Sequence, residues 1–586
     1  MSRPGATRPH GSRGEIVTNR DVTHVLLDMA DLVELSGDDP FKAVAYRKAA
    51  RAIDQYPEDV SLLVEQGRLL EVPGVGKGIA GKVEELVRTG TFRLYEELKA
   101  RVPPGLRDLL RLPGLGPKTA AQLHQRLGVD SLESLKAALD SGAVRDLPGF
   151  GEKKAENLRH SLESLQHVAD RTPLGHVLPW ALPLRDTVAA LPGVERAELA
   201  GSLRRRRDTV GDVDVVAAAD DPPAVLAAFA GLRGVAEVLG QGDSKCSVVL
   251  DNGRQVDLRV VRPDQFVTTL HHFTGSKDHN VRLRARAKDR GLKLNEYGLF
   301  HEDGSPVPIR SEEEIYRALG LAYIPPELRE DLGEVEAAEE DRLPDLLRLE
   351  DIRGDLHVHT RWSDGLATVR EMAHAARDRG YEYLAISDHS PSLVVAGGLT
   401  PERLRLQWDE IRQAAEELGF PILRSAEVDI LRDGSLDLPD EVLAELDFVT
   451  ASIHTGFRQD RETLTQRVLR AMENPHVDSI AHPTGRLLAR REPYLVDMDR
   501  IIEAAVRTGT CLEINASPER LDLSAEHARQ ARDAGVMIAI NTDAHQVETL
   551  EDMWFGVGQA RRAWLGPSQV LNARGLPALL DYLKIT

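Results

Sequence analysis

The stretch DLHVHTRWSDG (355–365) decides the fold of the carboxyl-terminal part of this chain. His357 and His359 lie two residues apart on a predicted strand, so their imidazoles share one face, and Asp364 follows in the loop. Downstream, short apolar runs such as YLAIS and MIAIN alternate with amphipathic helical stretches, and polar residues follow most of the runs. This alternation predicts a closed parallel barrel whose strand ends gather these side chains on one face. The candidate metal ligands are His357, His359, Asp364, His389, Glu427, His454, His482, Asp543 and His545.

Scattered surface histidines are the alternative, but with only 19 histidines in 586 residues chance would not place them repeatedly at strand ends. The ligand order resembles that of the PHP (polymerase and histidinol phosphatase) phosphoesterases over residues 351–586. The resemblance implies up to three divalent ions, with Glu427 bridging two of them. Clustered cations lower the pKa of bound water and clamp phosphate oxygens. Mixed histidine and carboxylate ligands suit Mn²⁺ or Zn²⁺ and do not choose between them.

A second signature, LAGSLRRRRDTVGDVDVV (199–216), lies in the first half of the chain. Asp212 and Asp214 alternate with valines on a predicted strand, so their carboxylates project from one face, and Asp257 occupies another alternating run. Three carboxylates on adjacent strands form the oxygen-rich pocket that two Mg²⁺ ions need for in-line phosphoryl transfer. A D-x-D pair alone is usually a solvated strand end. The Gly-Ser before it, the third aspartate and the arginines at 204–207, which would face a triphosphate, favour catalysis.

Together with HFTGSKDHN (272–280) and NEY (295–297), this pattern resembles the family X DNA polymerases. The resemblance implies that Asp212, Asp214 and Asp257 hold two Mg²⁺ or Mn²⁺ ions and are the catalytic residues. His272 stands where several eukaryotic members have tyrosine, which leaves the selectivity for the sugar open. The residues implied in nucleotide binding are Gly201, Ser202, Arg205, Gly211, His272, Phe273, Gly275, Ser276, Asn280 and Arg284.

Three glycine-centred turns precede that region: VPGVGKGIAGKV (72–83), LPGLGPKTAAQL (112–123) and LPGFGEKKAENL (147–158). In a helix-hairpin-helix, the glycines form a tight turn and the next helix presents free backbone N–H groups to a DNA phosphate. A single such turn could be an ordinary helix–helix connection, but three ahead of a polymerase-like region favour contact with DNA without sequence reading. The implied DNA-binding residues here are Gly74, Gly76, Gly114, Gly116, Lys118, Gly149 and Gly151.

The stretch PFKAVAYRKAARAI (40–53) resembles the amino-terminal small domain of the same polymerases, in which Lys42, Tyr46 and Arg47 would face a downstream 5′-phosphate. Lys82 matches the position of the Schiff-base lysine in relatives with lyase activity, although Gly78 stands where they have a supporting lysine. A phosphate contact or a solvated position is an equal alternative for Lys82, so lyase activity stays open.

The formal charge of −20 is unevenly distributed: residues 351–586 carry −12, residues 301–350 carry −10, and residues 1–300 carry +2. Basic residues also concentrate between 277 and 293, on a predicted helix that either lies along a phosphate backbone or is an ordinary charged surface helix. The acidic segment 330–350 is predicted to be a solvated, partly helical linker. The amino-terminal half is therefore the expected DNA-binding side.

A chain of this length predicts several domains. Two cysteines in separate predicted domains predict a reducing cytoplasm without disulfides, and the lack of any 18-residue apolar run predicts that nothing spans a membrane. The resemblance to family X polymerases of the bacterial type adds the expectation of a bacterial, nucleoid-associated protein. The predicted domains are a disordered tail (1–18), a helical small domain (19–102), a fingers-like helical domain (103–175), a nucleotidyltransferase palm (176–265), a thumb-like domain (266–329), the acidic linker (330–350) and the PHP domain (351–586).

The predicted fold class is multidomain α/β: a helical helix-hairpin-helix region, a mixed α+β palm and a distorted (β/α) barrel. We expect a DNA repair polymerase that fills gaps, including those of base excision repair. It would be fused to a metal-dependent 3′–5′ exonuclease, to which abasic-site endonuclease or 3′-phosphatase action could be added. The expected partners are gapped or primer–template DNA and deoxynucleoside triphosphates, with no membrane, and the expected state is a monomer. The alternatives are a histidinol-phosphate-type phosphatase with a DNA-tethering half, and a non-enzymatic DNA-end scaffold.

Overall fold

The computed structural model describes residues 19–36, 40–54, 56, 60–72, 74–111, 115–145, 147, 150–152, 155–156, 158–159 and 171–584. The predicted tail 1–18 and the turn residues Gly114 and Gly149 lie outside them. The chain divides into two compact units, Met1–Ala169 and Asp170–Thr586.

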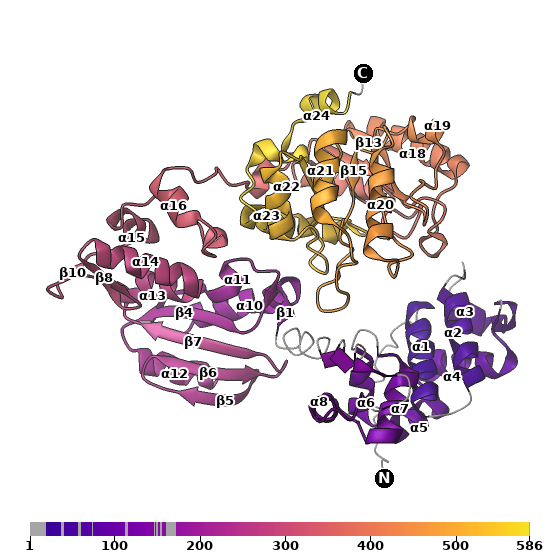
Figure 1. The fold of residues 1–586 in the computed structure, drawn as a ribbon, viewed down its shortest axis with the longest axis horizontal. Coiled ribbons are helices and arrows are strands. Elements are labelled where there is room, and N and C mark those ends of the chain that lie inside the picture. Colours follow the sequence, from indigo (N-terminus) through magenta and orange to yellow (C-terminus); the bar gives the residue numbers. More distant parts are fainter. Residues whose placement is uncertain are drawn as a thin grey trace, which may run out of the picture. The chain divides into compact units, whose positions relative to one another are not determined.

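The first unit is helical (Figure 1). One hydrophobic core joins residues from the two predicted helical domains, because Val22 and Leu26 of the first belong to the same buried cluster as Leu106 and Leu123 of the second. The predicted boundary at 102/103 thus does not separate two cores. The helices are α1 (Asn19–Leu35), α2 (Pro40–Asp54), α3 (Val60–Glu65), α4 (Lys77–Thr89), α5 (Arg93–Arg101), α6 (Pro104–Asp108), α7 (Pro117–Leu127) and α8 (Leu132–Asp140).

The second unit begins with a mixed five-stranded sheet in the order β2-β4-β7-β6-β5. The interior strand β4 contributes to two cores: Val215 and Ala217 face one, and Val216 and Ala218 face the other, as the two-residue period of a strand requires. The elements are β1 (Thr172–Pro173), α10 (Leu174–Ala189), β2 (Val194–Leu199), α11 (Gly201–Arg204), β3 (Thr209–Val210), β4 (Val213–Ala219), α12 (Pro222–Ala230), β5 (Val235–Gln241), β6 (Lys245–Leu250) and β7 (Gln255–Val261).

A thumb-like layer covers one face of this sheet through the core that contains Val216 and Ala218. Its small antiparallel sheet has the order β10-β9-β8. The elements are α13 (Phe266–Thr274), α14 (Lys277–Asp289), β8 (Leu292–Asn295), β9 (Gly298–His301), β10 (Pro306–Val307), α15 (Glu312–Ala318) and α16 (Glu334–Glu339).

The acidic segment 330–350 differs from the predicted solvated linker. Glu334 is fully buried and accepts a hydrogen bond from the backbone N–H of Asp331 at 2.9 Å, while its carboxylate lies 2.6 Å from His279 Nδ1. Val335 and Leu346 are part of the thumb core. The acidic composition did not indicate this packing, because composition does not show that a carboxylate such as Glu334 has a buried partner or that Val335 and Leu346 reach the core.

The remaining residues form a seven-stranded parallel sheet with the strands in sequence order, β11 to β17. A bridge between Val358 and Ala544 joins the first and last strands, and the backbone N–H of His359 donates to Ala544 O at 2.8 Å. The sheet is therefore a nearly closed barrel. Its strands are β11 (Gly354–Asp355), β12 (Tyr383–Ile386), β13 (Ile422–Asp429), β14 (Phe448–Ser452), β15 (Ser479–Ile480), β16 (Cys511–Asn515) and β17 (Ile538–Asn541).

Helices alternate with the barrel strands (Figure 1). Side chains that precede them, such as Thr400, Asp460 and Ser524, cap their first backbone N–H groups. The helices are α17 (Val369–Asp378), α18 (Pro401–Leu418), α19 (Asp440–Leu443), α20 (Arg461–Met472), α21 (Met498–Thr508), α22 (Ala525–Asp533), α23 (Met553–Arg562) and α24 (Leu576–Tyr582).

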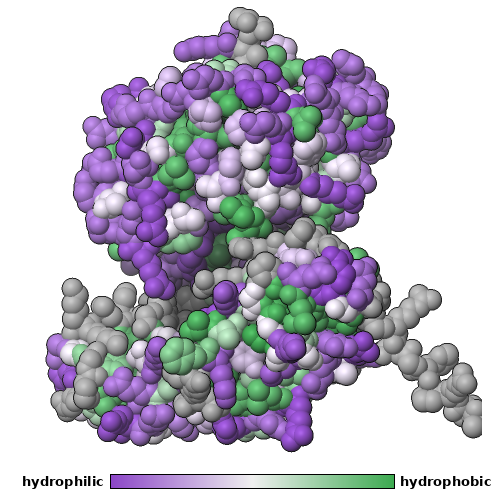
Figure 2. Space-filling view, turned by 90° about the vertical axis from the view of Figure 1, so that its right-hand side faces the viewer, coloured by the Kyte–Doolittle hydropathy of each residue, from purple (hydrophilic) through white to green (hydrophobic). Residues whose placement is uncertain are grey.

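The surface face drawn in Figure 2 is mainly hydrophilic, with hydrophobic residues in small groups. Among the described residues, no helix has the length and apolarity that crossing a bilayer requires. Cys246 and Cys511, the two cysteines of the chain, are both buried and carry free thiols.

Candidate active sites

The first candidate site is a cluster of three aspartates near the amino-terminal ends of β4 and β7, two interior strands of the five-stranded sheet. Asp214 of β4 lies beside Asp257 of β7 in parallel register, and Asp212 precedes β4. One carboxylate oxygen from each residue lies within 4.8 Å of the others. The spacing predicted from the sequence thus brings the three acids together.

The surroundings of these aspartates suit cations. Burial and the charges of Asp212 and Asp257 raise the pKa of Asp214 to about 7. Lys245 of the neighbouring strand β6 places its Nζ 2.6 Å from Asp257 Oδ2. Arg259 also offsets part of the charge of Asp214. Three clustered carboxylates are typical of a site for divalent ions.

Gly201 allows the turn before α11 to approach Asp214 closely. Its φ is +60°, and a Cβ atom there would lie 2.3 Å from Asp214 Oδ2. We expect Gly201→Ala to lower single-nucleotide incorporation into gapped duplex roughly 10- to 100-fold, because it strains the turn and displaces a carboxylate.

Gly193→Ala is the matched control, because Gly193 also has a positive φ of +83°, but a Cβ atom there would meet no other atom within 4 Å. DNA trimming measured on the same preparations reports whether the protein has folded. Incorporation by the Gly201 variant at the rate of the Gly193 variant would show that Asp214 does not need this close approach.

Of the predicted nucleotide-binding residues, Gly201 and Phe273 lie beside the cluster, whereas Asn280 and Arg205 already have protein partners. Phe273 lines a small cavity of about 40 Å³ together with Asp214 and Asp257. Asn280 donates from its amide to His272 O at 2.7 Å, so it holds the helix end that carries His272 and Phe273. Of the remaining predicted residues, Gly201 and Ser202 lie on α11, Gly211 lies before β4, Gly275 and Ser276 precede α14, and Arg284 is exposed on α14.

The arginine run 204–207 is not free to act as a purely cationic patch. Arg204 pairs with Glu312 at 2.6 Å, and Arg205 pairs with Glu330 at 3.0 Å and donates to Thr274 O. Arg206 and Arg207 also lie within 3.6 Å of glutamates 327 and 330. Glu312, Glu327 and Glu330 of the stretch 301–350 therefore offset part of the positive charge of these arginines.

The second candidate site lies where the barrel strands end, and all nine predicted ligands meet there. Glu427 is at its centre and is 1% exposed. Its Oε2 lies 2.8 Å from His389 Nδ1, and its Oε1 lies 2.9 Å from His482 Nε2. His357, His359 and His454 lie within 3.7 Å of the same carboxylate.

Three groups of potential ligand atoms can be distinguished within this cluster. They are His359–Asp364–His389–His545, His357–His359–Glu427 and His389–Glu427–His454, and Glu427 belongs to two of them. Asp543 lies beside them, with its Oδ1 3.1 Å from His359 Nε2. In the described part of the chain, Nδ1 of His359 and Nδ1 of His482 are buried without a hydrogen-bond partner. Buried imidazoles with unpaired nitrogens around a shared carboxylate fit a cluster of divalent metal ions.

The close packing of carboxylates and imidazoles shifts the pKa values of His389 and His359 in opposite directions. Burial opposes protonation of His389, but the negative charge of Glu427 raises its pKa to about 10. Burial and the neighbouring imidazoles of His545 and His389 lower the pKa of His359 to about 3. Such perturbed groups are characteristic of functional sites.

Residues that orient the ligands were missed by the sequence analysis. Glu513 is fully buried, its Oε1 lies 2.8 Å from His357 Nδ1, and its Oε2 accepts from the backbone N–H of His482. Asp429 Oδ1 lies 2.8 Å from His454 Nδ1. Asp429 follows Glu427 by two residues on β13, and this same-face spacing was the available signal.

The glycine turns lie in the helical unit. Gly76 and Gly116 immediately precede α4 and α7 as their N-caps, and Gly74 and Gly151 have φ values of +91° and +111°. The side chain of Lys118 is exposed on the first turn of α7. The turns therefore leave the N-termini of two helices open, as contact with phosphate requires.

The predicted 5′-phosphate residues lie on α2 and α4 of the same unit. Lys42 is exposed, whereas Tyr46 is only 5% exposed, and Lys82 Nζ lies 5.8 Å from the centre of its ring. Arg47 pairs with Glu34 and Asp31 at 2.9 and 2.7 Å. Lys82 also donates to Gly78 O at 2.8 Å.

Four family models match the chain. They are a helix-hairpin-helix domain at residues 17–92, a SAM-like helix-hairpin-helix tandem at 106–164, a DNA polymerase beta thumb at 269–330 and a PHP domain at 355–517. The chain is also 45% identical over 569 residues to the DNA polymerase/3′-5′ exonuclease PolX of Bacillus subtilis, which covers 96% of this chain and 99% of that protein.

The chain belongs to the family X DNA polymerases that carry a PHP domain. DNA polymerase lambda of Rattus norvegicus is 28% identical over 53% of this chain and 56% of its own length. A protein named as a probable phosphatase in Acetivibrio thermocellus is 33% identical over 33% of this chain and 78% of its own length. These matches confirm the predicted fold class and the predicted family X polymerase with a PHP domain.

Proposed function

We propose that the chain fills gaps in duplex DNA as a template-directed polymerase and trims 3′ ends as a metal-dependent exonuclease. One observation carries the proposal: the family match spans nearly the whole chain, and the two parts of that match each contain a complete cluster of potential metal ligands. A histidinol-phosphate-type phosphatase with a DNA-tethering half would leave the aspartate cluster without a role.

In the polymerase site, Asp212, Asp214 and Asp257 would hold two Mg²⁺ or Mn²⁺ ions. These ions supply positive charge to the attacking 3′ oxygen and to the triphosphate. Gly201 and Ser202 form the turn next to Asp214, where the backbone can approach a phosphate. Phe273 lines the cavity beside the acids and gives it an apolar wall.

In the barrel site, the nine ligands would hold up to three Mn²⁺ or Zn²⁺ ions, which polarise the phosphodiester and activate water. Glu427 would be shared between two ions, because its two oxygens face different imidazoles. Glu513 and Asp429 fix the orientation of His357 and His454, which keeps the ligand geometry rigid.

Activity on defined DNA tests the proposal. The protein is incubated with gapped, recessed and abasic duplexes, with and without deoxynucleotides, in Mg²⁺ and in Mn²⁺. We expect gap filling with nucleotides and 3′ shortening without them. Cleavage at the abasic site would add endonuclease action to the barrel, and release of phosphate from histidinol phosphate but not from DNA would contradict the proposal.

DNA binding through the helix-hairpin-helix turns leads to a further expectation. Gly76 and Gly116 have φ values of −82° and −81° and open space around a Cβ position, so Gly76→Val and Gly116→Val preserve the fold. The added side chains would cover the backbone N–H groups of α4 and α7. We expect weaker binding to gapped duplex of any sequence, and a salt slope smaller by about 1 for each phosphate contact that is lost.

Gly81→Val on α4 is the control, since Gly81 also has open space but lies beyond the helix start. Fluorescence anisotropy at several salt concentrations measures the affinity. If the turn variants bind as tightly as the Gly81 variant at low salt, the turns are structural connections only.

A further inference from the structure

The barrel segment 517–523 connects the metal cluster with the polymerase palm. It follows β16, which carries Glu513 and Asn515, and precedes α22. Asn515 donates from its amide to Asp543 Oδ2 at 3.0 Å, and Arg520 Nε lies 3.6 Å from the same oxygen. Among the described residues, Arg520 is the only arginine or lysine that pairs with Asp364, Glu427 or Asp543.

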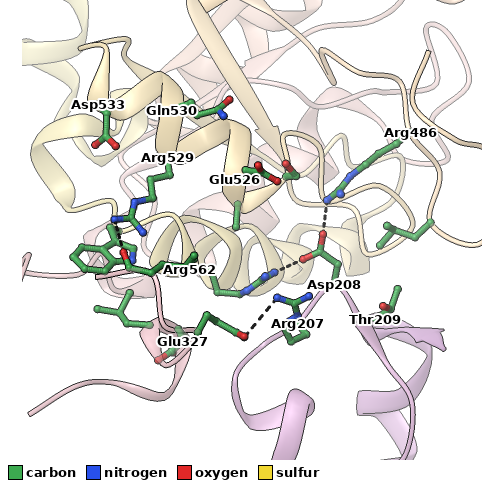
Figure 3. A pocket seen from close by; sticks show the side chains of 17 residues that line it. Arg207, Asp208, Thr209, Glu327, Arg486, Glu526, Arg529, Gln530, Asp533 and Arg562 are labelled. Atoms are coloured by element: carbon green, nitrogen blue, oxygen red, sulfur yellow. Dashed lines mark hydrogen bonds and ion pairs between the residues drawn. The ribbon is translucent and has the colours of Figure 1, made fainter. Parts of the chain in front are cut away.

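Asp208 of the palm is held between two arginines of the barrel, as Figure 3 shows. Its Oδ2 accepts from Arg486 Nη2 at 2.8 Å, and its Oδ1 pairs with Arg562 Nη1. Burial opposes ionisation, but the charges of Arg562 and Arg486 hold the pKa of Asp208 at about 2. The carboxylate is therefore charged throughout the neutral pH range. It lines a cavity of about 720 Å³ between the palm and the barrel.

Both arginines are connected by hydrogen bonds to the backbone carbonyl of Leu521 in segment 517–523, Arg486 directly and Arg562 through Gln559. Arg486 donates to Leu521 O and, from its Nε, to Arg520 O at 2.9 Å. Arg562 donates to Gln559 Oε1 at 3.2 Å, and the amide of Gln559 donates to Leu521 O at 3.2 Å. Asp208 thus orients Arg486 directly and Gln559 through Arg562. Arg486 and Gln559 in turn hold the backbone at Leu521, next to Arg520.

A second part of the palm contacts the same segment. His176 Nε2 lies 2.6 Å from Glu519 Oε1, and a Cβ atom on Gly175 would lie 2.2 Å from Pro518 Cβ. These residues belong to the start of α10, whereas Asp208 precedes β3. Two separate parts of the palm, the start of α10 and the loop with Asp208, therefore fix the position of segment 517–523, which contacts the barrel metal cluster through Arg520.

We propose that Arg520 binds the scissile phosphate in the barrel site, and that Asp208 of the palm is a positioning residue that holds Arg520 there through Arg486 and Leu521. A guanidinium presents a fixed fork of donors that matches phosphate oxygens, so its position decides how well it binds. The palm then contributes to the nuclease reaction without touching its substrate. This inference rests on the proposed exonuclease function of the barrel.

A double-mutant cycle on the full chain tests the inference. We expect Asp208→Asn to lower DNA trimming about 10- to 100-fold, as removal of a group that orients a functional residue does, and gap filling to be retained. Arg520→Gln should lower trimming at least as much and raise the KM for DNA, with partial rescue by Arg520→Lys. In the Arg520→Gln background, Asp208→Asn should cost nothing further.

Glu327→Gln is the matched control, because Glu327 of the thumb-like domain pairs with Arg561 of the barrel at 2.8 Å but does not touch segment 517–523. It should trim DNA at the wild-type rate. Wild-type trimming by Asp208→Asn, or an equal loss from this change in both backgrounds, would overturn the inference.

Hydrogen exchange of the metal-free protein provides a readout that does not depend on catalysis. The backbone N–H groups of Arg520 and Leu521 donate to Ser517 O at 2.8 and 2.9 Å. We expect the peptide that covers 515–523 to exchange faster in Asp208→Asn than in the wild type or in Glu327→Gln. Unchanged exchange would overturn the positioning role of Asp208, whereas a wild-type protein that does not trim DNA would instead remove the proposed exonuclease function.

Discussion

Glu427→Gln is expected to reduce DNA trimming by about 10³-fold or more, because a bridging charge that the bound cations require is lost. Glu427 is buried and lies within 3.7 Å of His357, His359, His389, His454 and His482. A neutral amide in this position leaves the surrounding imidazoles without their shared negative partner. Metal content measured by mass spectrometry should fall, while gap filling should continue at the wild-type rate.

Glu445→Gln serves as the matched control for this prediction. Glu445 lies in the same barrel, but it pairs with Arg405 on the surface and its side chain is 43% exposed. Its loss should change trimming little, because exposed ion pairs contribute little. Trimming by the Glu427 variant at the rate of the Glu445 variant would remove the barrel cluster from the reaction.

Asp257→Ala is expected to abolish nucleotide incorporation, again by about 10³-fold or more, and to leave trimming largely intact. Asp257 lies beside Asp214 in the sheet register and supplies one corner of the aspartate cluster. Its removal leaves Lys245 without its 2.6 Å partner and so lowers the affinity of the site for cations in two ways. Primer extension on a gapped duplex, in Mg²⁺ and in Mn²⁺, measures the effect.

Asp264→Ala is the control for this change, since Asp264 follows β7 closely but pairs with Arg262 on the surface, where its side chain is 63% exposed. It should extend primers normally. Residual incorporation near the wild-type rate in Asp257→Ala would mean that the aspartate cluster is not the polymerase centre.

The two clusters could be predicted from the sequence because their residues follow strand periodicity. Asp212 just before β4 and Asp214 on it are two residues apart, as are His357 and His359 after β11, so the side chains of each pair share a face in an extended chain. Parallel strands also bring their carboxyl ends to one edge, which gathers His454, His482 and Asp543 without further information.

Pairings between distant segments could not be predicted in this way. The arginines 204–207 have their glutamate partners more than a hundred residues away, at 312–330. The sequence predicted that these arginines face a triphosphate and gave no sign of the glutamate partners. The same limit applies to Asp208, whose partners Arg486 and Arg562 lie in the barrel. Ion pairs of this kind depend on how finished domains pack, and local patterns contain no signal for that.

Cleavage of the backbone within segment 330–350 would not release two independent halves. Glu334 and Val335 are buried in the thumb-like layer, so cleavage there would disrupt a hydrophobic core. Asp208 would still hold Arg486 and Arg562 across the cut.

One experiment tests the central claim, that two independent metal centres on one chain perform opposite reactions on a primer 3′ end. A 5′-labelled primer in a gapped duplex is incubated in Mn²⁺ with the wild type, Asp257→Ala, Glu427→Gln and the double variant, with and without deoxynucleotides. We expect extension and shortening by the wild type, shortening alone by Asp257→Ala, extension alone by Glu427→Gln, and an unchanged primer with the double variant. Loss of both reactions in either single variant, or shortening by the double variant, would contradict the central claim.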